Sequence, residues 1–185
     1  MVFLLYNEIK MYESPEFKLI KKIGNLELRD YQEFFTVAIH EPSLQGYSGF
    51  GYLFNYISGN NQKGMKMKMT VPVINDLDEK EKSMEFVIPK IHTQDIPQPL
   101  YQQMKIKHYP SQMVIVYTFS GYIPKEKMET INEKMRAFAK NEDLIAIGDL
   151  KIARYNGPYT LPFLRHNEIW LNASASDKLD KAHKA

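Results

Sequence analysis

The chain has 185 residues and no cysteine, and 44% of its residues are hydrophobic while 25% are charged. This length supports one domain with a substantial core, and the absence of cysteine excludes disulfides, a cysteine nucleophile and thiolate metal ligands. Lysine and arginine together number 24 against 22 acidic residues, without a basic stripe, which argues against a nucleic-acid partner.

Both ends of the chain are predicted to lie outside the domain. Residues 1–15 contain a short apolar run without a preceding basic region or a cleavage site, so we predict a terminal extension rather than a signal peptide. Residues 173–185 are small and polar, which is typical of a disordered tail, and residues 16–172 then form a single domain. No run approaches the ~18 apolar residues of a membrane span, so we predict a cytoplasmic protein without a membrane partner.

The first half of the chain predicts strands around one helix. Gly24 and Asn25 form a tight turn between two strands. Phe50, Phe54 and Ile57 share one face at helical spacing, and a glycine follows as a natural stop. The expected elements are, in chain order, strands at 17–23, 26–31 and 33–40, a helix at 46–58, and strands at 65–74 and 84–89.

After a proline-rich connector at 95–100, the second half predicts the same order of elements. They are strands at 104–108 and 112–120, a helix at 125–141 that buries Met128, Ile131, Met135 and Phe138, and strands at 149–155 and 168–171. The repeated order predicts the α+β class, with two pseudo-symmetric β-α-β-β halves that form a distorted antiparallel β-barrel flanked by two helices. We interpret it as an internal duplication.

Methionine and lysine alternate in the segment KGMKMKMTVPV. In an extended chain, Met65, Met67 and Met69 point to one side and the lysines to the other. The thioethers could bind a soft metal, but no cysteine or histidine accompanies them, which favours a core or pocket wall. The cations could contact the carboxylates of an amphipathic ligand or form a solvated face; they are Lys63, Lys66 and Lys68.

Aromatic residues occupy both faces of the predicted helix at 46–58. One core-facing stripe explains Phe50 and Phe54 but explains Tyr47 and Tyr52 less well. An additional aromatic face beside glycines can line a flat apolar pocket, because glycine allows a ligand to approach closely.

No histidine pair has the spacing of metal ligands, so no metal site is predicted. His166 and His40 are candidates for the axial ligand of a haem iron, although a structural role is the common one for a single histidine. No catalytic motif is present, which predicts a protein that is not an enzyme. Glu168, beside Trp170, is an acidic residue that we expect to be buried, as an acid or base or as a hydrogen-bond partner of a loop.

Three stretches resemble the SOUL haem-binding protein family. They are NLELRDY, YISGNNQKGMKMKMTVPV and ARYNGPYTLPFLRHNEIWL, and the similarity spans about residues 17–172 in consistent order. The resemblance implies an apolar groove for haem or another tetrapyrrole, formed by the first helix and the C-terminal proline loop. Mapped onto this chain, the groove uses Tyr47, Phe50, Phe54 and Ile57, with Tyr159 and Phe163 opposite.

The resemblance thus implies a carrier or buffer of haem through a small-molecule site. Where one branch of the family has a proposed axial histidine, this chain has Asp30, which implies modest, reversible binding. A second hypothesis is an effector-binding module of the gyrase-inhibitor-like type, in which Glu168 selects flat organic cations. A third is small-molecule hydrolysis in the same pocket.

Overall fold

The computed structural model describes residues 12–40, 48–77, 82–122 and 125–175. In chain order, its elements are β1 (Phe17–Ile23), β2 (Leu26–Tyr31), β3 (Phe34–His40), α2 (Ser48–Ile57), β4 (Val73–Asp76), β5 (Ser83–Val87), η1 (Lys90–His92), β6 (Met104–Tyr109), β7 (Gln112–Phe119), α3 (Lys125–Asn141), β8 (Leu144–Arg154), η2 (Pro162–Leu164) and β9 (Asn167–Ala175). None of the described helices has the length and apolar character needed to cross a membrane.

The described strands form one sheet of nine in the order β1-β2-β7-β9-β8-β4-β5-β3-β6. Every neighbouring pair is antiparallel, which confirms the α+β class. The order is open, with β1 and β6 at its edges, so the closed barrel and the pseudo-symmetry stay predictions.

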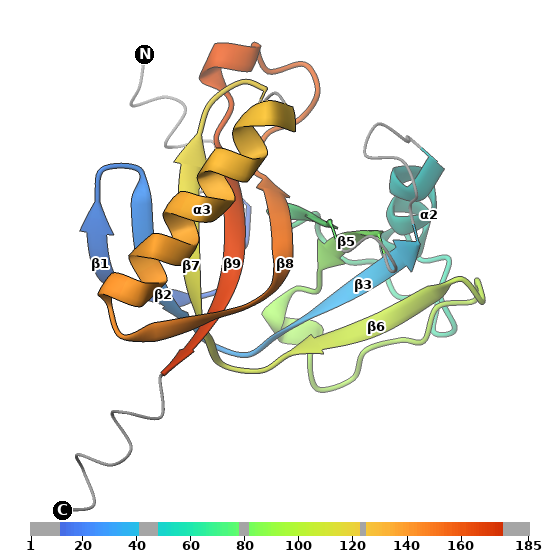
Figure 1. Cartoon of the computed structure of the whole chain (residues 1–185). Coiled ribbons are helices and arrows are strands. Elements are labelled where there is room, and N and C mark those ends of the chain that lie inside the picture. The colour runs from blue at the N-terminus through green and yellow to red at the C-terminus, as the bar shows by residue number, and fades with distance from the viewer. Residues whose placement is uncertain (1–11, 41–47, 78–81, 123–124, 176–185) are drawn as a thin grey trace, which may run out of the picture.

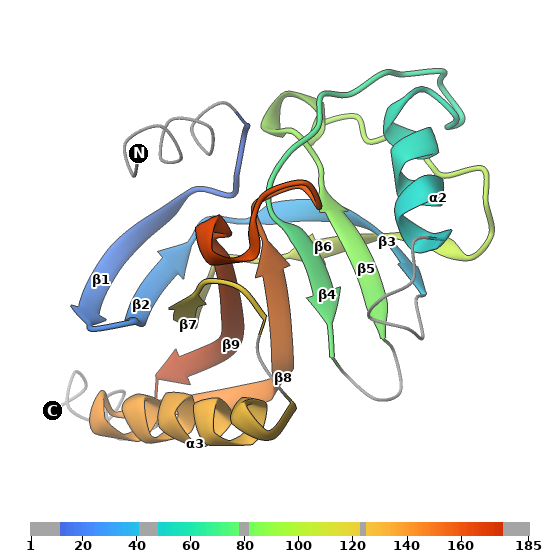
Figure 2. The ribbon, with the colours of Figure 1, turned by 90° about the horizontal axis from the view of Figure 1, so that it is seen from above.

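The two helices cover different parts of the sheet (Figure 1). α3 packs on β7 and β8, and α2 packs on β3 and β5. The predicted apolar stripe of α3 is confirmed, because Ile131, Met135 and Phe138 are buried between the helix and the sheet. Figure 2 shows β4 and β8 side by side between the regions that the two helices occupy.

A third cluster fills the sheet face opposite the helices. Along β9, Ile169 packs in the α3 cluster whereas the next residue, Trp170, packs in this inner cluster, as alternation in a strand requires. Only two residues separate the end of β2 at Tyr31 from the start of β3 at Phe34, although these strands are near opposite ends of the strand order, and the two rings lie 6.3 Å apart. The sheet therefore bends around its own inner face.

The methionine segment is not the strand that its alternation predicted. β4 begins only at Val73, and residues 65–69 have no strand partner. The Met67 N–H instead donates to the Ile57 carbonyl at the end of α2, 2.8 Å away, which explains why no sheet ladder forms here. The predicted core role is confirmed, because Met67 is buried and Met65 and Met69 pack beside it.

Two strands are longer than predicted. β8 begins at Leu144 rather than at residue 149, and it includes a register shift after Ile147 around Gly148, whose φ is 71°. β9 continues to Ala175 because its last residues pair with β8, so residues 173–175 of the expected tail belong to the sheet. The rest of that tail, 176–185, and residues 1–11 of the expected extension lie outside the described residues.

Candidate functional site

The outer face of α2 exposes aromatic side chains. Phe50 and Phe54 are 39% and 50% exposed, and their rings lie nearly parallel with centroids 6.3 Å apart. Phe50 also meets the ring of Phe86 edge-on at 5.1 Å. Ile57, also named for the groove, lies on the sheet-facing side of α2 and is buried in the core with Leu53 and Tyr56. The core-facing stripe predicted from the sequence is therefore wrong for Phe50 and Phe54. Tyr47 lies outside the described residues.

The loop at 156–166 is a second apolar surface. Tyr159 is 99% exposed and Phe163 is 67% exposed. Arg165 shapes the loop by donating from Nε to the Thr160 carbonyl and from Nη2 to the Pro158 carbonyl, both at 2.8 Å. No ring contact among the described residues joins Tyr159 or Phe163 to α2, so their place across a groove from that helix stays a prediction.

Beneath this loop, a buried carboxylate collects donors from several strands. Glu168 is 1% exposed, and its carboxylate accepts hydrogen bonds from Nη1 and Nη2 of Arg29, at 3.1 and 2.8 Å. The Tyr155 hydroxyl donates at 2.9 Å, and Trp170 Nε1 donates at 2.6 Å. His166 Nε2 lies 2.9 Å from Glu168 Oε1. All of these groups help to satisfy one carboxylate.

The network decides the charge state of Glu168. Burial alone would raise the pKa of this carboxyl, but the hydrogen bond from His166 and the charge and hydrogen bonds of Arg29 outweigh it and lower the pKa to about 2. Glu168 is therefore ionised near neutral pH, which does not suit a general acid. Because Arg29 already neutralises it, Glu168 is also not an open selector for organic cations.

Glu85 is a second buried carboxylate that the sequence analysis missed. It is fully buried and accepts Lys107 Nζ at 2.7 Å, the Tyr109 hydroxyl at 3.0 Å and the Thr36 hydroxyl at 2.8 Å. The pattern that could have indicated it is Lys107-x-Tyr109, which repeats Arg29-x-Tyr31 of the other network.

The candidate axial histidines occupy different places. His166 is half-buried, and its Nε2 is engaged by Glu168. His40 ends β3 and lines a cavity of about 190 Å³ together with Lys82 and Lys105. Among the described residues, no group of three or more metal-ligating side chains is arranged to hold an ion.

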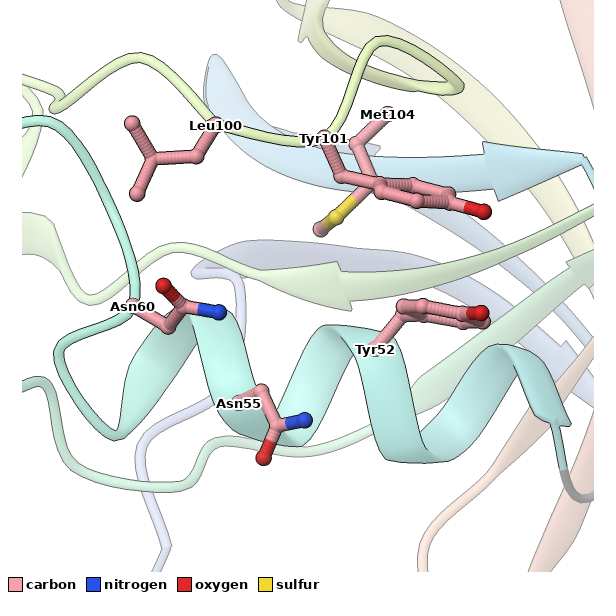
Figure 3. Close-up of a pocket in the computed structure, with 6 residues that line it drawn as sticks. All are labelled: Tyr52, Asn55, Asn60, Leu100, Tyr101 and Met104. Atoms are coloured by element: carbon pink, nitrogen blue, oxygen red, sulfur yellow. The ribbon is translucent and has the colours of Figure 1, made fainter.

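Another cavity, of about 180 Å³, lies between α2 and the segment before β6 (Figure 3). Tyr52 and Tyr101, which both line it, stack with ring centroids 4.5 Å apart. Both cavities are smaller than the roughly 300 Å³ at which drug-sized ligand sites begin. Neither cavity is therefore large enough to enclose a flat macrocycle.

One of the three lysines considered for contact with ligand carboxylates is already paired. Lys63 forms an ion pair with Asp95, whereas Lys66 and Lys68 are exposed. The turn that precedes them is fixed by the buried Asn61, which donates to the Tyr56 carbonyl at 2.9 Å and the Met65 carbonyl at 2.7 Å.

Replacing Asn61 with alanine should lower the free energy of unfolding by about 2 kcal/mol, because it leaves these backbone carbonyls without their donor. Asn61 Oδ1 also accepts the backbone N–H groups of Lys63 and Met65. Urea unfolding at neutral pH measures the effect. The exposed neighbour Asn60 is the matched control, and an Asn61→Ala loss no larger than that of Asn60→Ala would contradict the expectation.

Comparison with known proteins gives a family match over most of the chain. The model of the SOUL heme-binding protein family matches residues 12–172. Heme-binding protein 2 of Homo sapiens is 29% identical over 162 residues, covering 80% of this chain and 78% of that protein.

Two solved structures share the fold. The C-terminal domain of EcmrR superposes with a TM-score of 0.55 at 9% identity, covering 81% of this chain and 97% of that chain. A hydrolase from Listeria innocua superposes with a TM-score of 0.54 at 14% identity, covering 91% and 98%. At these identities the likeness concerns the fold alone.

Proposed function

Because this chain belongs to the SOUL heme-binding protein family, we propose that it binds haem or a related tetrapyrrole and acts as a reversible, non-enzymatic carrier or buffer. The observation that carries the proposal is the open aromatic surface of Phe50 and Phe54 on α2. In this proposal the exposed loop residues Tyr159 and Phe163 form the second wall of the ligand site. A cytoplasmic location belongs to the same proposal.

The chemical character of the exposed side chains suits a tetrapyrrole. Exposed phenylalanine and tyrosine rings suit the faces of a macrocycle, and burial contributes about 25 cal/mol per Å² before ordering costs. Lys66 and Lys68 are exposed cations that could contact its carboxylates. Haem would supply an iron with axial coordination positions, for which His166 and His40 are the candidate ligands.

An internal duplication would account for this architecture. Outward from the β8–β4 junction, the order β9, β7, β2 on one side has its counterpart in β5, β3, β6 on the other. Tyr31 opposes Gln112 in the β2–β7 ladder, and Tyr109 opposes Phe34 in the β6–β3 ladder at the equivalent register. These correspondences support two pseudo-symmetric halves enclosing a barrel-like core.

The rival functions have less support. Cation selection needs a free acidic group, and Glu168 is paired with Arg29 at 2.8 Å. Hydrolysis by Glu168 needs a carboxyl that can hold a proton near neutral pH, and the pKa of Glu168 is lowered to about 2.

A hemin titration followed by the Soret band tests the proposal. Phe54→Ala should weaken binding about tenfold, because the ligand loses about 1.4 kcal/mol of apolar contact. Ile91→Ala, at a side chain that is 83% exposed outside α2, should leave the affinity unchanged. His166→Ala should have a smaller effect than Phe54→Ala.

Two outcomes would count against the proposal in different ways. Equal affinities of the wild type and Phe54→Ala would remove the α2 surface from the site. A wild-type response that does not saturate would contradict haem binding itself.

A further inference from the structure

Two arginines at the connection between β8 and β9 have no carboxylate partner among the residues that the structure describes. Arg165 donates to neutral oxygens, including the Tyr122 hydroxyl at 3.1 Å. Arg154, the last residue of β8, donates from Nη1 to the side-chain oxygen of Asn75. Neither forms a salt bridge with a described acidic residue. Buried or half-buried guanidinium groups are ordinarily paired, so this is an excess of positive charge.

Asn75, which accepts the hydrogen bond from Arg154, itself carries a donor without an acceptor. Its side chain is 1% exposed, and its Nδ2 has no hydrogen-bond partner. Flipping the amide would not help, because Nδ2 would then face Arg154, which can only donate. The pair Arg154–Asn75 therefore has more donors than acceptors, and buried donors of this kind require an explanation.

The electrostatics agree with the geometry. Burial and the neighbouring charge of Arg165 both lower the pKa of the Arg154 guanidinium from its usual value. Among the described residues no acidic group offsets these effects, so within this part of the chain the positive charge of Arg154 is uncompensated. An anion beside Arg154 would relieve the repulsion between the two guanidinium groups.

The strand register places Arg154 on the same sheet face as the aromatic surface of α2. Arg154 lies opposite Val73 on β4, and Val73 lies opposite Phe86 on β5. Directly opposed residues in antiparallel strands point to the same face. Both Val73 and Phe86 pack in the core cluster beneath α2, which contains Leu53, Tyr56 and Ile57. Phe86 is also the residue that Phe50 meets edge-on.

The row of opposed residues Arg154, Val73 and Phe86 gives the distance between the first and the last of them. Two strand spacings of about 4.8 Å place the backbone of Arg154 roughly 10 Å from that of Phe86. A flat macrocycle that covers Phe50 and carries short carboxylate arms can bridge such a distance. Arg154 is half-buried, so part of its side chain is exposed to solvent.

We propose that Arg154, beside Arg165, binds a carboxylate of the ligand that lies over Phe50 and Phe54. This inference rests on the proposed tetrapyrrole binding and deepens it by assigning the carboxylate end of the site. A guanidinium suits this task because its fork matches a carboxylate with two parallel hydrogen bonds. Lys63, considered for the same role from the sequence, is already paired with Asp95.

Protoporphyrin IX and its dimethyl ester are the probes that test this assignment, because they carry no iron and differ only in their free carboxylates. Fluorescence titration gives the Kd of each for the wild type, Arg154→Gln and Arg136→Gln. Arg136 is the control, since it is exposed on α3 and bonded to Asn132 and the Gly148 carbonyl. The wild type and the control should prefer the diacid about tenfold, and Arg154→Gln should lose that preference while binding the ester as before.

The outcomes separate the two proposals. No binding of either porphyrin by the wild type would overturn the proposed function. Binding with a diacid preference that Arg154→Gln retains would overturn the assignment of Arg154 alone. Should Arg154→Gln fail to fold in a circular-dichroism melt, Arg154→Met replaces it; this variant removes both the charge and the fork, and an unchanged preference there would also overturn the assignment.

Discussion

Replacing Arg29 with methionine should lower the free energy of unfolding by about 3–5 kcal/mol, because the change leaves a buried carboxylate without its cation. Arg29 is 5% exposed and Glu168 is 1% exposed, so water cannot take the place of the guanidinium. Arg29 also contacts Glu27, 2.6 Å from its Nη2, and this second carboxylate would lose the same partner. Urea unfolding at neutral pH measures the loss.

Two further variants decide how the result is interpreted. Arg136→Met, at an exposed position of α3, should change the free energy of unfolding by less than about 0.5 kcal/mol. The double variant Arg29→Met with Glu168→Leu should recover only part of the loss: it removes both charges of the buried pair, but it leaves the Tyr155 and Trp170 donors without their acceptor. If Arg29→Met were no more destabilising than Arg136→Met, the ion pair would contribute little to the fold.

Local patterns were sufficient to predict most elements of this fold. The hairpin of β1 and β2 was predicted with its bounds, because Gly24 supplies the positive φ, 58°, that the turn needs. The helix at 125–141 was predicted with its bounds because its apolar residues recur at helical spacing. These features depend on neighbours within a few positions, which the sequence shows directly.

Long-range partners could not be predicted in the same way. Burial of Glu168 was expected, but its partner Arg29 lies 139 positions away, and only the β2–β7–β9 ladders bring the two strands together. The methionine segment failed as a strand for a related reason, since its alternating burial is satisfied by the end of α2. Arg154 gave no pattern in the sequence, because its significance depends on which residues it lacks as partners.

Acid should destabilise the protein through Glu168. Its pKa is about 2 in the folded chain against about 4.3 in an unfolded one, so between these values the unfolded state binds more protons. The stabilisation is therefore fully present above about pH 5 and is lost as the pH falls through 2, by about 3 kcal/mol in total. Urea unfolding at a series of pH values from 7 to 3 should show this fall.

The comparison of Glu168→Gln with Glu129→Gln isolates the effect. Glu129 is exposed on α3, so its variant should retain the wild-type decline between pH 5 and 3. Glu168→Gln should start from a lower stability at neutral pH, because a neutral amide is a poorer partner for Arg29, and should then decline less with acid. A decline in Glu168→Gln as steep as in the wild type would mean that other carboxylates carry the acid response. Glu27 would then be the carboxylate to test next. Its burial alone would raise its pKa, but the hydrogen bonds and charges of Lys22 and Arg29 outweigh burial and lower it.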